Sequence, residues 1–287
     1  MPRLIRASLL PAFAVASLFL ATALAPAPAS AGRQDAVGVI PPQAHPYGSS
    51  YGDWSAKWWQ WAYGLPVAGH PLFDETGADC AAGQSGQVWF LGGVFNVSGS
   101  ATRDQCVVPA GKALFIPILN TEWDNICPPS SYTIDELRAL AKASMDAATD
   151  LSCDVDGLLV RDISRYRFVS QPFNVTIPSD NLYVLFCGEP GAGTYGPLVG
   201  DGYYLMLTPL SQGESHTIHF HGSIPGVFTL DITYHLTPGN TPQGTVAVSG
   251  PGATGMSART MPWFKAGSAR ITPTLQSTWG AVKTYYR

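Results

Sequence analysis

Eight short apolar and aromatic runs, separated by breaks rich in Gly, Pro and Asn, constrain this 287-residue chain more than any other feature. Runs of this kind between turn-forming residues are typical of β-strands. The predicted strands cover residues 87–97, 112–119, 166–170, 173–177, 182–186, 203–208, 216–221 and 227–236. This pattern predicts a mainly β chain with a β-sandwich or jelly-roll-like domain. The dipeptide Asp156-Gly157 predicts a hairpin turn.

One helix is predicted near the start of this domain, over a tryptophan-rich segment. Ser50 and Asp53 have the spacing of a capping box, in which two side chains satisfy free N–H groups at a helix start. Four tryptophans follow, and they are Trp54, Trp58, Trp59 and Trp61. All except Trp59 share one helical face. Such a stripe commonly docks a helix onto the core; the alternative is that these four rings, and Trp123 further along, bind a ligand such as a sugar.

A second helix, inserted between strands, is predicted over residues 134–148. Thr133 stands where a helix cap belongs. The apolar side chains that share one face of this helix are Ile134, Leu137, Leu140, Ala141 and Met145.

The first 31 residues have the pattern of a secretory signal peptide. Arg3 and Arg6 precede an apolar run over residues 7–25, and Ala29-Ser30-Ala31 is a small-residue cleavage site. We therefore expect an extracellular protein with one β-rich domain over residues 32–237. No later run is long and apolar enough to predict a membrane span. Residues 238–287, rich in Gly, Pro, Thr and Ser, are expected to form a poorly ordered or weakly docked tail.

Composition excludes several classes of protein and partner. Hydrophobic residues make up 46% of the chain and charged residues 13%, which is unlike the composition of a disordered chain. The balance of 16 Lys and Arg against 20 Asp and Glu provides no basic surface. Nucleic acid is therefore not predicted as a partner.

All five cysteines follow the predicted signal peptide, where an oxidising compartment permits disulfides. Cys80 and Cys106 flank one aromatic strand segment, whereas Cys127 and Cys153 flank the inserted helix. The predicted pairs are therefore Cys80–Cys106 and Cys127–Cys153, and Cys187 is left over. Spacing alone leaves other pairings open.

Several motifs resemble a family of secreted bacterial proteins. They are YGSSYGDWSAKWWQW within residues 47–62, the segments 80–94, 106–123 and 201–211, and HTIHF at 216–220 followed by LDITYHLT at 230–237. The family is common in actinobacteria, and its members are mostly labelled hypothetical. The resemblance implies export and one shared domain, and it carries no activity. Family members tend to have a small residue where His221 stands, so a hypothesis that needs His221 is particular to this chain.

Three histidines in one predicted strand form a candidate metal site. In an extended strand His219 and His221 project to one face and His216 to the other. Pairing with the next strand puts Thr229 and Asp231 on the face of His219 and His221. Imidazoles presented in this way can bind copper or zinc, so these three histidines are candidate ligands and either metal is a candidate cofactor. The alternative is a solvated polar face that contains histidines.

Carboxylates provide a second candidate site. Glu122 and Asp124 share a face if the chain stays extended beyond the strand at 112–119. Two carboxylates can act as acid and base on a glycosidic bond when they lie about 5–9.5 Å apart, or they can bind calcium. Asp201, between two glycines, becomes a catalytic candidate only if the fold brings it beside Glu122. The alternative is an acidic loop whose side chains bond to their own backbone.

The leading hypothesis from the sequence is an extracellular β-sandwich protein that binds carbohydrate or cell-envelope material. The alternative is a secreted enzyme: a glycan hydrolase or lyase that uses Glu122 and Asp201, or a metal-dependent enzyme that uses His219 and His221. Exposure of the helix tryptophans distinguishes these hypotheses in part, because burial of all four removes the aromatic support for ligand binding.

Overall fold

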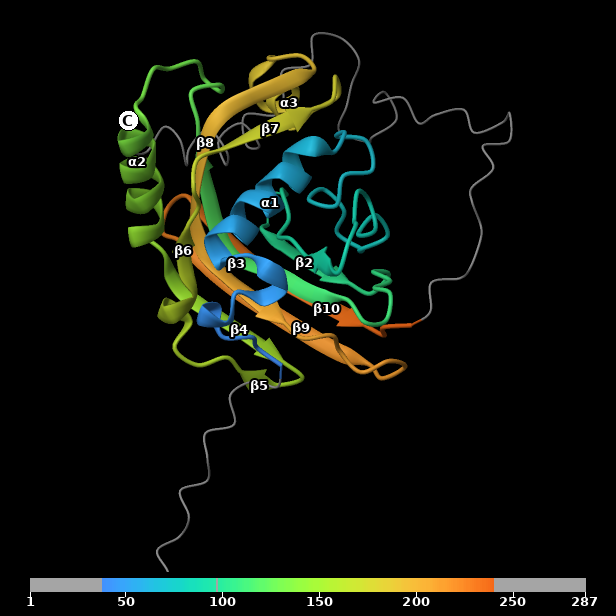
Figure 1. The fold of residues 1–287 in the computed structure, drawn as a ribbon. Coiled ribbons are helices and arrows are strands. Elements are labelled where there is room, and N and C mark those ends of the chain that lie inside the picture. Colours follow the sequence, from blue (N-terminus) through green and yellow to red (C-terminus); the bar gives the residue numbers. More distant parts are fainter. Residues whose placement is uncertain (1–37, 97, 240–287) are drawn as a thin grey trace, which may run out of the picture. The chain divides into compact units, whose positions relative to one another are not determined.

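Two five-stranded sheets pack against each other in the computed structural model, which describes residues 38–96 and 98–239 (Figure 1). The first sheet contains β1 (Val88–Phe90), β3 (Ala113–Trp123), β8 (Gly193–Leu207) and β6 (Arg167–Val169), in this order, with β7 (Phe173–Ile177) also paired to β8. The second sheet has the order β2 (Ser100–Arg103), β10 (Phe228–Leu236), β9 (His216–Ile224), β4 (Thr149–Val155) and β5 (Leu158–Leu159). The prediction of a mainly β sandwich is therefore confirmed.

Apolar side chains from alternate strand positions fill the space between the sheets. Ile218 and Phe220 of β9 and Ile232 of β10 belong to one buried cluster with Ile116 of β3 and Leu205 of β8. Buried and outward side chains alternate along β9, as expected for a strand with one buried face. In contrast, β3 is buried along nearly its whole length, because both faces of this strand are covered.

The tryptophan-rich helix α1 (Tyr51–Gly64) covers the face of the first sheet that points away from the second sheet. Two short 3-10 turns, η1 (Pro42–Ala44) and η2 (Pro46–Gly48), precede it. The predicted capping box is present: the Ser50 side chain accepts from the N–H of Asp53, and the Asp53 side chain accepts from the N–H of Ser50. The helix packs on the side chains of Phe115 and Tyr204. The interpretation of the tryptophan stripe as a core contact is confirmed.

The inserted helix α2 (Ile134–Asp146) lies along β8, on the opposite face of β3 and β8 from α1 (Figure 1). Thr133 and Glu136 form a second capping box at its start. Leu137 and Ala141 pack against Trp123 and Val199, which come from the two long strands. The predicted cap is confirmed, and the helix ends two residues earlier than expected. Of the predicted apolar face, Leu137, Ala141 and Met145 are buried and Leu140 is half-buried, whereas Ile134 is exposed.

The predicted strand at 182–186 is wrong, because these residues form the helix α3 (Leu182–Cys187). The side chain of Asn181 accepts from the N–H of Val184 and caps the helix start, and Gly188 ends it with a left-handed φ of 81°. A short apolar run without clear periodicity fits a strand or a buried helical turn equally well. The local caps and the buried side chains of Leu182 and Phe186 decide for the helix.

Three strands of the second sheet, β2, β4 and β5, were not among the predicted strands. β4 starts directly after α2 and forms a hairpin with β5. Asp156 and Gly157 make its turn with φ angles of 53° and 76°, so the predicted hairpin is confirmed. A further 3-10 turn, η3 (Ile163–Tyr166), leads from β5 toward β6.

Predictions for both ends of the chain fall largely outside the described residues. These are the signal peptide at 1–31 and residues 240–287 of the expected tail. The first two tail residues are described, and the carbonyl of Gly239 accepts from the N–H of Ala110 at 2.8 Å. Within the described ranges, no helix has the length and apolar character that a membrane crossing requires.

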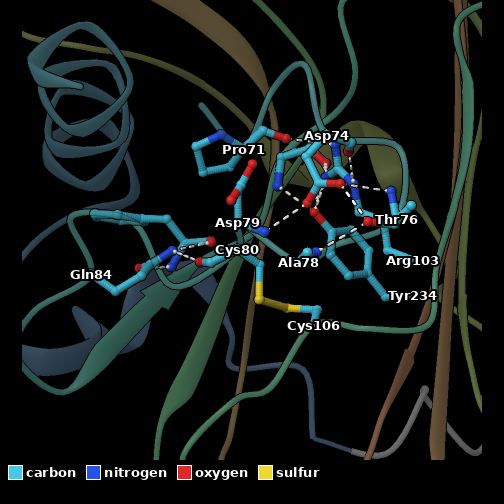
Figure 2. Close-up of a disulfide and its surroundings, with 12 residues drawn as sticks. Pro71, Asp74, Thr76, Ala78, Asp79, Cys80, Gln84, Arg103, Cys106 and Tyr234 are labelled. Carbon is cyan, nitrogen blue, oxygen red and sulfur yellow. Dashed lines mark hydrogen bonds between the residues drawn. A yellow bond between two sulfur atoms is a disulfide. The ribbon is translucent and has the colours of Figure 1, made fainter. Parts of the chain in front are cut away.

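The predicted disulfide Cys80–Cys106 is present, and it links the loop after α1 to the segment after β2 (Figure 2). The predicted pair Cys127–Cys153 is wrong, because Cys127 is bonded to Cys187. The strand β4 begins at Thr149 and carries Cys153 into the core between the sheets, where the thiol is free and the residue is fully buried. The end of α3 instead brings Cys187 to Cys127, with a Cα–Cα distance of 6.0 Å.

We expect peptide mapping without reduction to recover Cys80–Cys106 and Cys127–Cys187. Burial raises the pKa of the Cys153 thiol far above its ordinary value, so this thiol should react with iodoacetamide only after the chain is unfolded. Alkylation before and after denaturation, followed by mass spectrometry, measures this. A recovered Cys127–Cys153 peptide, or rapid alkylation of Cys153 in the native protein, would contradict the structure.

A buried arginine, Arg103, bonds to the backbone of loop segments near the Cys80–Cys106 disulfide (Figure 2). Arg103 lies near the Cys80–Cys106 disulfide, and its guanidinium stacks over the ring of Tyr234 (Figure 2). The guanidinium carbon is 5.0 Å from the centroid of that ring. Only 1% of Arg103 is exposed. Its hydrogen-bond acceptors are four backbone carbonyls, of Pro71, Asp74, Gly92 and Gly93, and the Tyr234 hydroxyl. Arg103 therefore satisfies the backbone of two loop segments, around residues 71–74 before β1 and residues 92–93 after it, which belong to no sheet or helix.

Candidate functional site

All five tryptophans considered for ligand binding lie in the core. Their exposed fractions are between 1% and 9%, for Trp54, Trp58, Trp59, Trp61 and Trp123. Trp58 donates to the carbonyl of Leu91 at 2.7 Å, and Trp123 donates to the hydroxyl of Ser144 at 3.1 Å. Since stacking on a sugar needs an exposed ring face, the structure provides no aromatic binding platform from these residues.

Glu122 and Asp124 project to the same side of the chain, as the extended backbone predicted, and both meet buried tyrosines. Tyr63 of α1 donates to Oε1 of Glu122 at 2.6 Å, and Tyr183 of α3 donates to Oδ2 of Asp124 at 3.0 Å. The two tyrosine rings stack, with centroids 4.6 Å apart and an interplanar angle of 9°. These four residues are named the tyrosine–carboxylate cluster.

The tyrosine–carboxylate cluster joins α1 and α3 to the end of β3. Burial, followed by the charge of Glu122, raises the pKa of both tyrosines well above the ordinary value. Both hydroxyls therefore remain protonated donors. Oδ1 of Asp124 also accepts from the N–H groups of Ile126 and Cys127 and so closes the turn after β3. With exposed fractions of 4% or less, the cluster is a structural contact between elements rather than an open acid–base site.

Asp201 lies on the other face of the first sheet from Glu122. The register pairs Asp201 with Thr121 and Gly200 with Glu122, so the two carboxylates point in opposite directions. The predicted catalytic pairing of Glu122 with Asp201 is therefore wrong. Asp201 accepts two hydrogen bonds from Arg167, at 2.7 and 3.1 Å, and Arg167 also bonds to Asp146 of α2.

The buried position of Asp201 changes its titration. Burial raises the pKa of Asp201, and the Arg167 guanidinium offsets only part of this effect, so the pKa stays above its ordinary value. The carboxylate is fully buried and bidentately held, which suits an anchor between α2 and the sheet.

The second sheet presents a polar outward surface. The strand registers align two rows of side chains across β4, β9, β10 and β2. One row is Ser152, His221, Asp231 and Ser100, and the other is Asp154, His219, Thr233 and Thr102. These eight residues are named the polar sheet face, and each of them is half-buried or exposed. Leu159, with 61% exposure, adds an apolar side chain beside Asp154 at the edge.

On this face, the ring of His219 contacts two aspartates. Its Nε2 lies 2.7 Å from Oδ1 of Asp231, and its Nδ1 lies 3.2 Å from Oδ2 of Asp154. The predicted placement of Asp231 on the face of His219 and His221 is confirmed by the register. Asp154 was missed because the strand that carries it, β4, was not predicted.

The three candidate metal ligands do not converge. His216 points to the inner side of β9, and its ring contacts Asp156 at 2.8 Å and the carbonyl of Ser211 at 3.3 Å. Both ring nitrogens of His219 face aspartates. Across residues 38–96 and 98–239, no group of three or more His, Cys, Asp or Glu side chains is arranged to hold a metal ion.

The fold and this surface define a class: a disulfide-bonded, two-sheet β-sandwich in which one sheet has a polar outward face. No family model, no curated protein and no solved structure matches the chain.

Proposed function

We propose that this chain is an exported binding protein that takes hydroxyl-rich polymers, such as the glycans of a cell envelope, on its polar sheet face. The observation that carries the proposal is the alignment of two four-residue rows across four adjacent strands. Strands lie about 4.8 Å apart and same-face residues about 6.6–7 Å apart along each strand. The rows therefore form a regular array of hydroxyl, carboxylate and imidazole groups.

The chemistry of this array suits a ligand with many hydroxyls. Serine and threonine hydroxyls both donate and accept, and the carboxylates of Asp154 and Asp231 accept. The groups stand on a paired sheet, so little conformational freedom is lost when a ligand is bound. Leu159 offers an apolar contact to the C–H groups of a sugar at the edge of the array.

Export is part of the same proposal. The predicted signal peptide and the resemblance to secreted bacterial proteins both point to a location outside the cytoplasm. The two disulfides fit an oxidising compartment.

We expect the purified chain to co-sediment with at least one of three insoluble polymers: peptidoglycan, chitin or cellulose. Thr233 and Thr102 are neighbours in one row, so the double variant Thr233→Val/Thr102→Val removes two hydroxyls while conserving volume. Two lost hydrogen bonds at about 0.5–1.5 kcal/mol each should weaken binding roughly 5- to 150-fold.

Thr176→Val, on β7 of the first sheet, is the matched control and should bind like the wild type. Thr176 is exposed and bonds only across the sheet to Thr194 among the contacts described for it. Failure to bind any of the three polymers, or equal binding by the double variant and the wild type, would refute the proposal.

A further inference from the structure

The ring of His219 lies between two carboxylates that come from two different neighbouring strands. Asp154 belongs to β4 and Asp231 to β10, and β9, which carries His219, runs between them. The His219 side chain is 36% exposed, Asp154 is 23% exposed and Asp231 is 51% exposed. Solvent protons therefore reach the ring, while the sheet holds its partners in place.

The number of protons on the ring decides how many strands it joins. An imidazolium has two N–H groups and can donate to both aspartates at once. A neutral imidazole has one N–H, so its second nitrogen presents a lone pair to a carboxylate oxygen. The contact to Asp231 is the shorter one, at 2.7 Å against 3.2 Å for Asp154. Loss of one proton should therefore retain the bond to Asp231 and release Asp154.

The charges around the ring favour the imidazolium. The two carboxylates that face the ring directly are those of Asp154 and Asp231. The neighbouring outward side chains on β9 are His221 and Thr217, and the backbone N–H of Thr217 donates to the carboxylate of Asp156. The carboxylate of Asp156 is also held by His216, and Asp104 at the far edge is held by His235. Partial burial lowers the pKa of His219, but the hydrogen bonds to Asp231 and Asp154 outweigh this effect, so the pKa lies above the ordinary value of 6.5.

We propose that His219 is a protonation-dependent clamp: as the imidazolium it ties β4 and β10 to β9, and on losing a proton it releases the carboxylate of Asp154 to the polar sheet face. The clamp itself depends only on the geometry of these three side chains. Its consequence for a ligand rests on the proposed function. The released carboxylate gains free acceptor positions for the hydroxyls of a bound polymer, so binding should strengthen as the pH rises.

Titration of the histidine rings by NMR in the full chain tests the clamp without any ligand. We expect a pKa above 6.5 for His219, and a fall of about half a pH unit or more in each of Asp154→Asn and Asp231→Asn. Above this pKa the ring should be the tautomer protonated at Nε2. A pKa at or below 6.5, or one that neither aspartate variant changes, would overturn the clamp.

Thermal unfolding provides a second measurement. A raised folded-state pKa stabilises the protein fully below the unfolded value of about 6.5, and this contribution disappears as the pH rises through the folded value. Between about pH 6 and pH 9 the wild type should therefore lose roughly 1–4 °C more in Tm than His219→Ala. Thr217→Val, on the same outward face of β9 and without a titratable side chain, is the control and should retain the wild-type profile. An identical profile for His219→Ala and the wild type would contradict the clamp.

The polymer that binds in the sedimentation experiment then serves as the probe for regulation. Wild-type affinity should rise about two- to tenfold across the titration of His219, whereas the affinity of His219→Ala, at whatever level, should not change over the same pH range. A raised His219 pKa together with pH-independent wild-type binding would overturn the regulatory role. Absence of binding at every pH would refute the proposed function, and the ligand-free titration would still decide the clamp.

Discussion

Arg103→Met is expected to lower the free energy of unfolding by about 3–5 kcal/mol. The residue is 1% exposed, and its guanidinium donates to four backbone carbonyls and one tyrosine hydroxyl. Methionine fills much of the same volume but donates nothing, so buried carbonyls lose their partners. Each buried acceptor left without a partner costs about 1–3 kcal/mol, and water that reaches the carbonyls of residues 71–74 and 92–93 relieves part of this cost.

Urea denaturation with both disulfides intact measures this loss. Arg161→Met replaces an exposed arginine and should stay within about 0.5 kcal/mol of the wild type. Arg103→Lys should fall between the two, because an ammonium has three N–H groups on one atom and cannot reach carbonyls spread around a planar fork. If Arg103→Met lowers the free energy of unfolding by less than about 1 kcal/mol, the loop segments 71–74 and 92–93 do not depend on this side chain.

Trp58→Ala is expected to destabilise the protein by about 3–5 kcal/mol. Trp58 is 2% exposed, meets Trp59 and Trp61 edge to face, and donates to the carbonyl of Leu91. Truncation leaves a large cavity between α1 and the first sheet and removes the donor for that carbonyl. Trp58→Phe keeps most of the buried ring and should cost about 1–3 kcal/mol, mainly through the lost hydrogen bond.

Lys57→Ala is the control on the same helix, one residue away on the exposed side. Its contacts are a hydrogen bond to Ser49 and a position over the Trp54 ring, and both are solvent-accessible interactions of small net value. The control should therefore change stability by less than about 1 kcal/mol. Equal losses for Trp58→Ala and Lys57→Ala in chemical denaturation would contradict the core role of the tryptophan stripe.

Features that depend on nearby residues could be predicted from the sequence. Both capping boxes join residues three positions apart, so their hydrogen bonds form whenever the helix forms. The Asp156-Gly157 turn follows from backbone preferences of two residues. The alternation that places His219 and Asp231 on one face follows from the strand period, once the hairpin is assumed.

The candidate site could be predicted only in part, because its key contacts join distant strands. The partner of His219 on β10 lies 12 residues away, whereas its partner on β4 lies 65 residues away. Similarly, Glu122 of β3 and Asp201 of β8 lie in two strands that pair with each other. The face of the sheet to which each side chain points depends on the register of this pair, which includes a bulge between Pro117 and Leu119. A shift of one residue reverses the face of every side chain that follows.

The sequence by itself determined the strand-rich architecture, the two capped helices and the position of three tryptophans on one helical face that can be buried. Periodicity and capping act within a few residues, so a local pattern is sufficient for these features. Only the tertiary structure decided that Cys187 rather than Cys153 bonds to Cys127, that Glu122 faces a tyrosine pair instead of Asp201, and that Asp154 completes the environment of His219. Each of these outcomes depends on which distant strands and helices are neighbours and in which register. That choice is made by the packing of the whole core, and no local pattern encodes it.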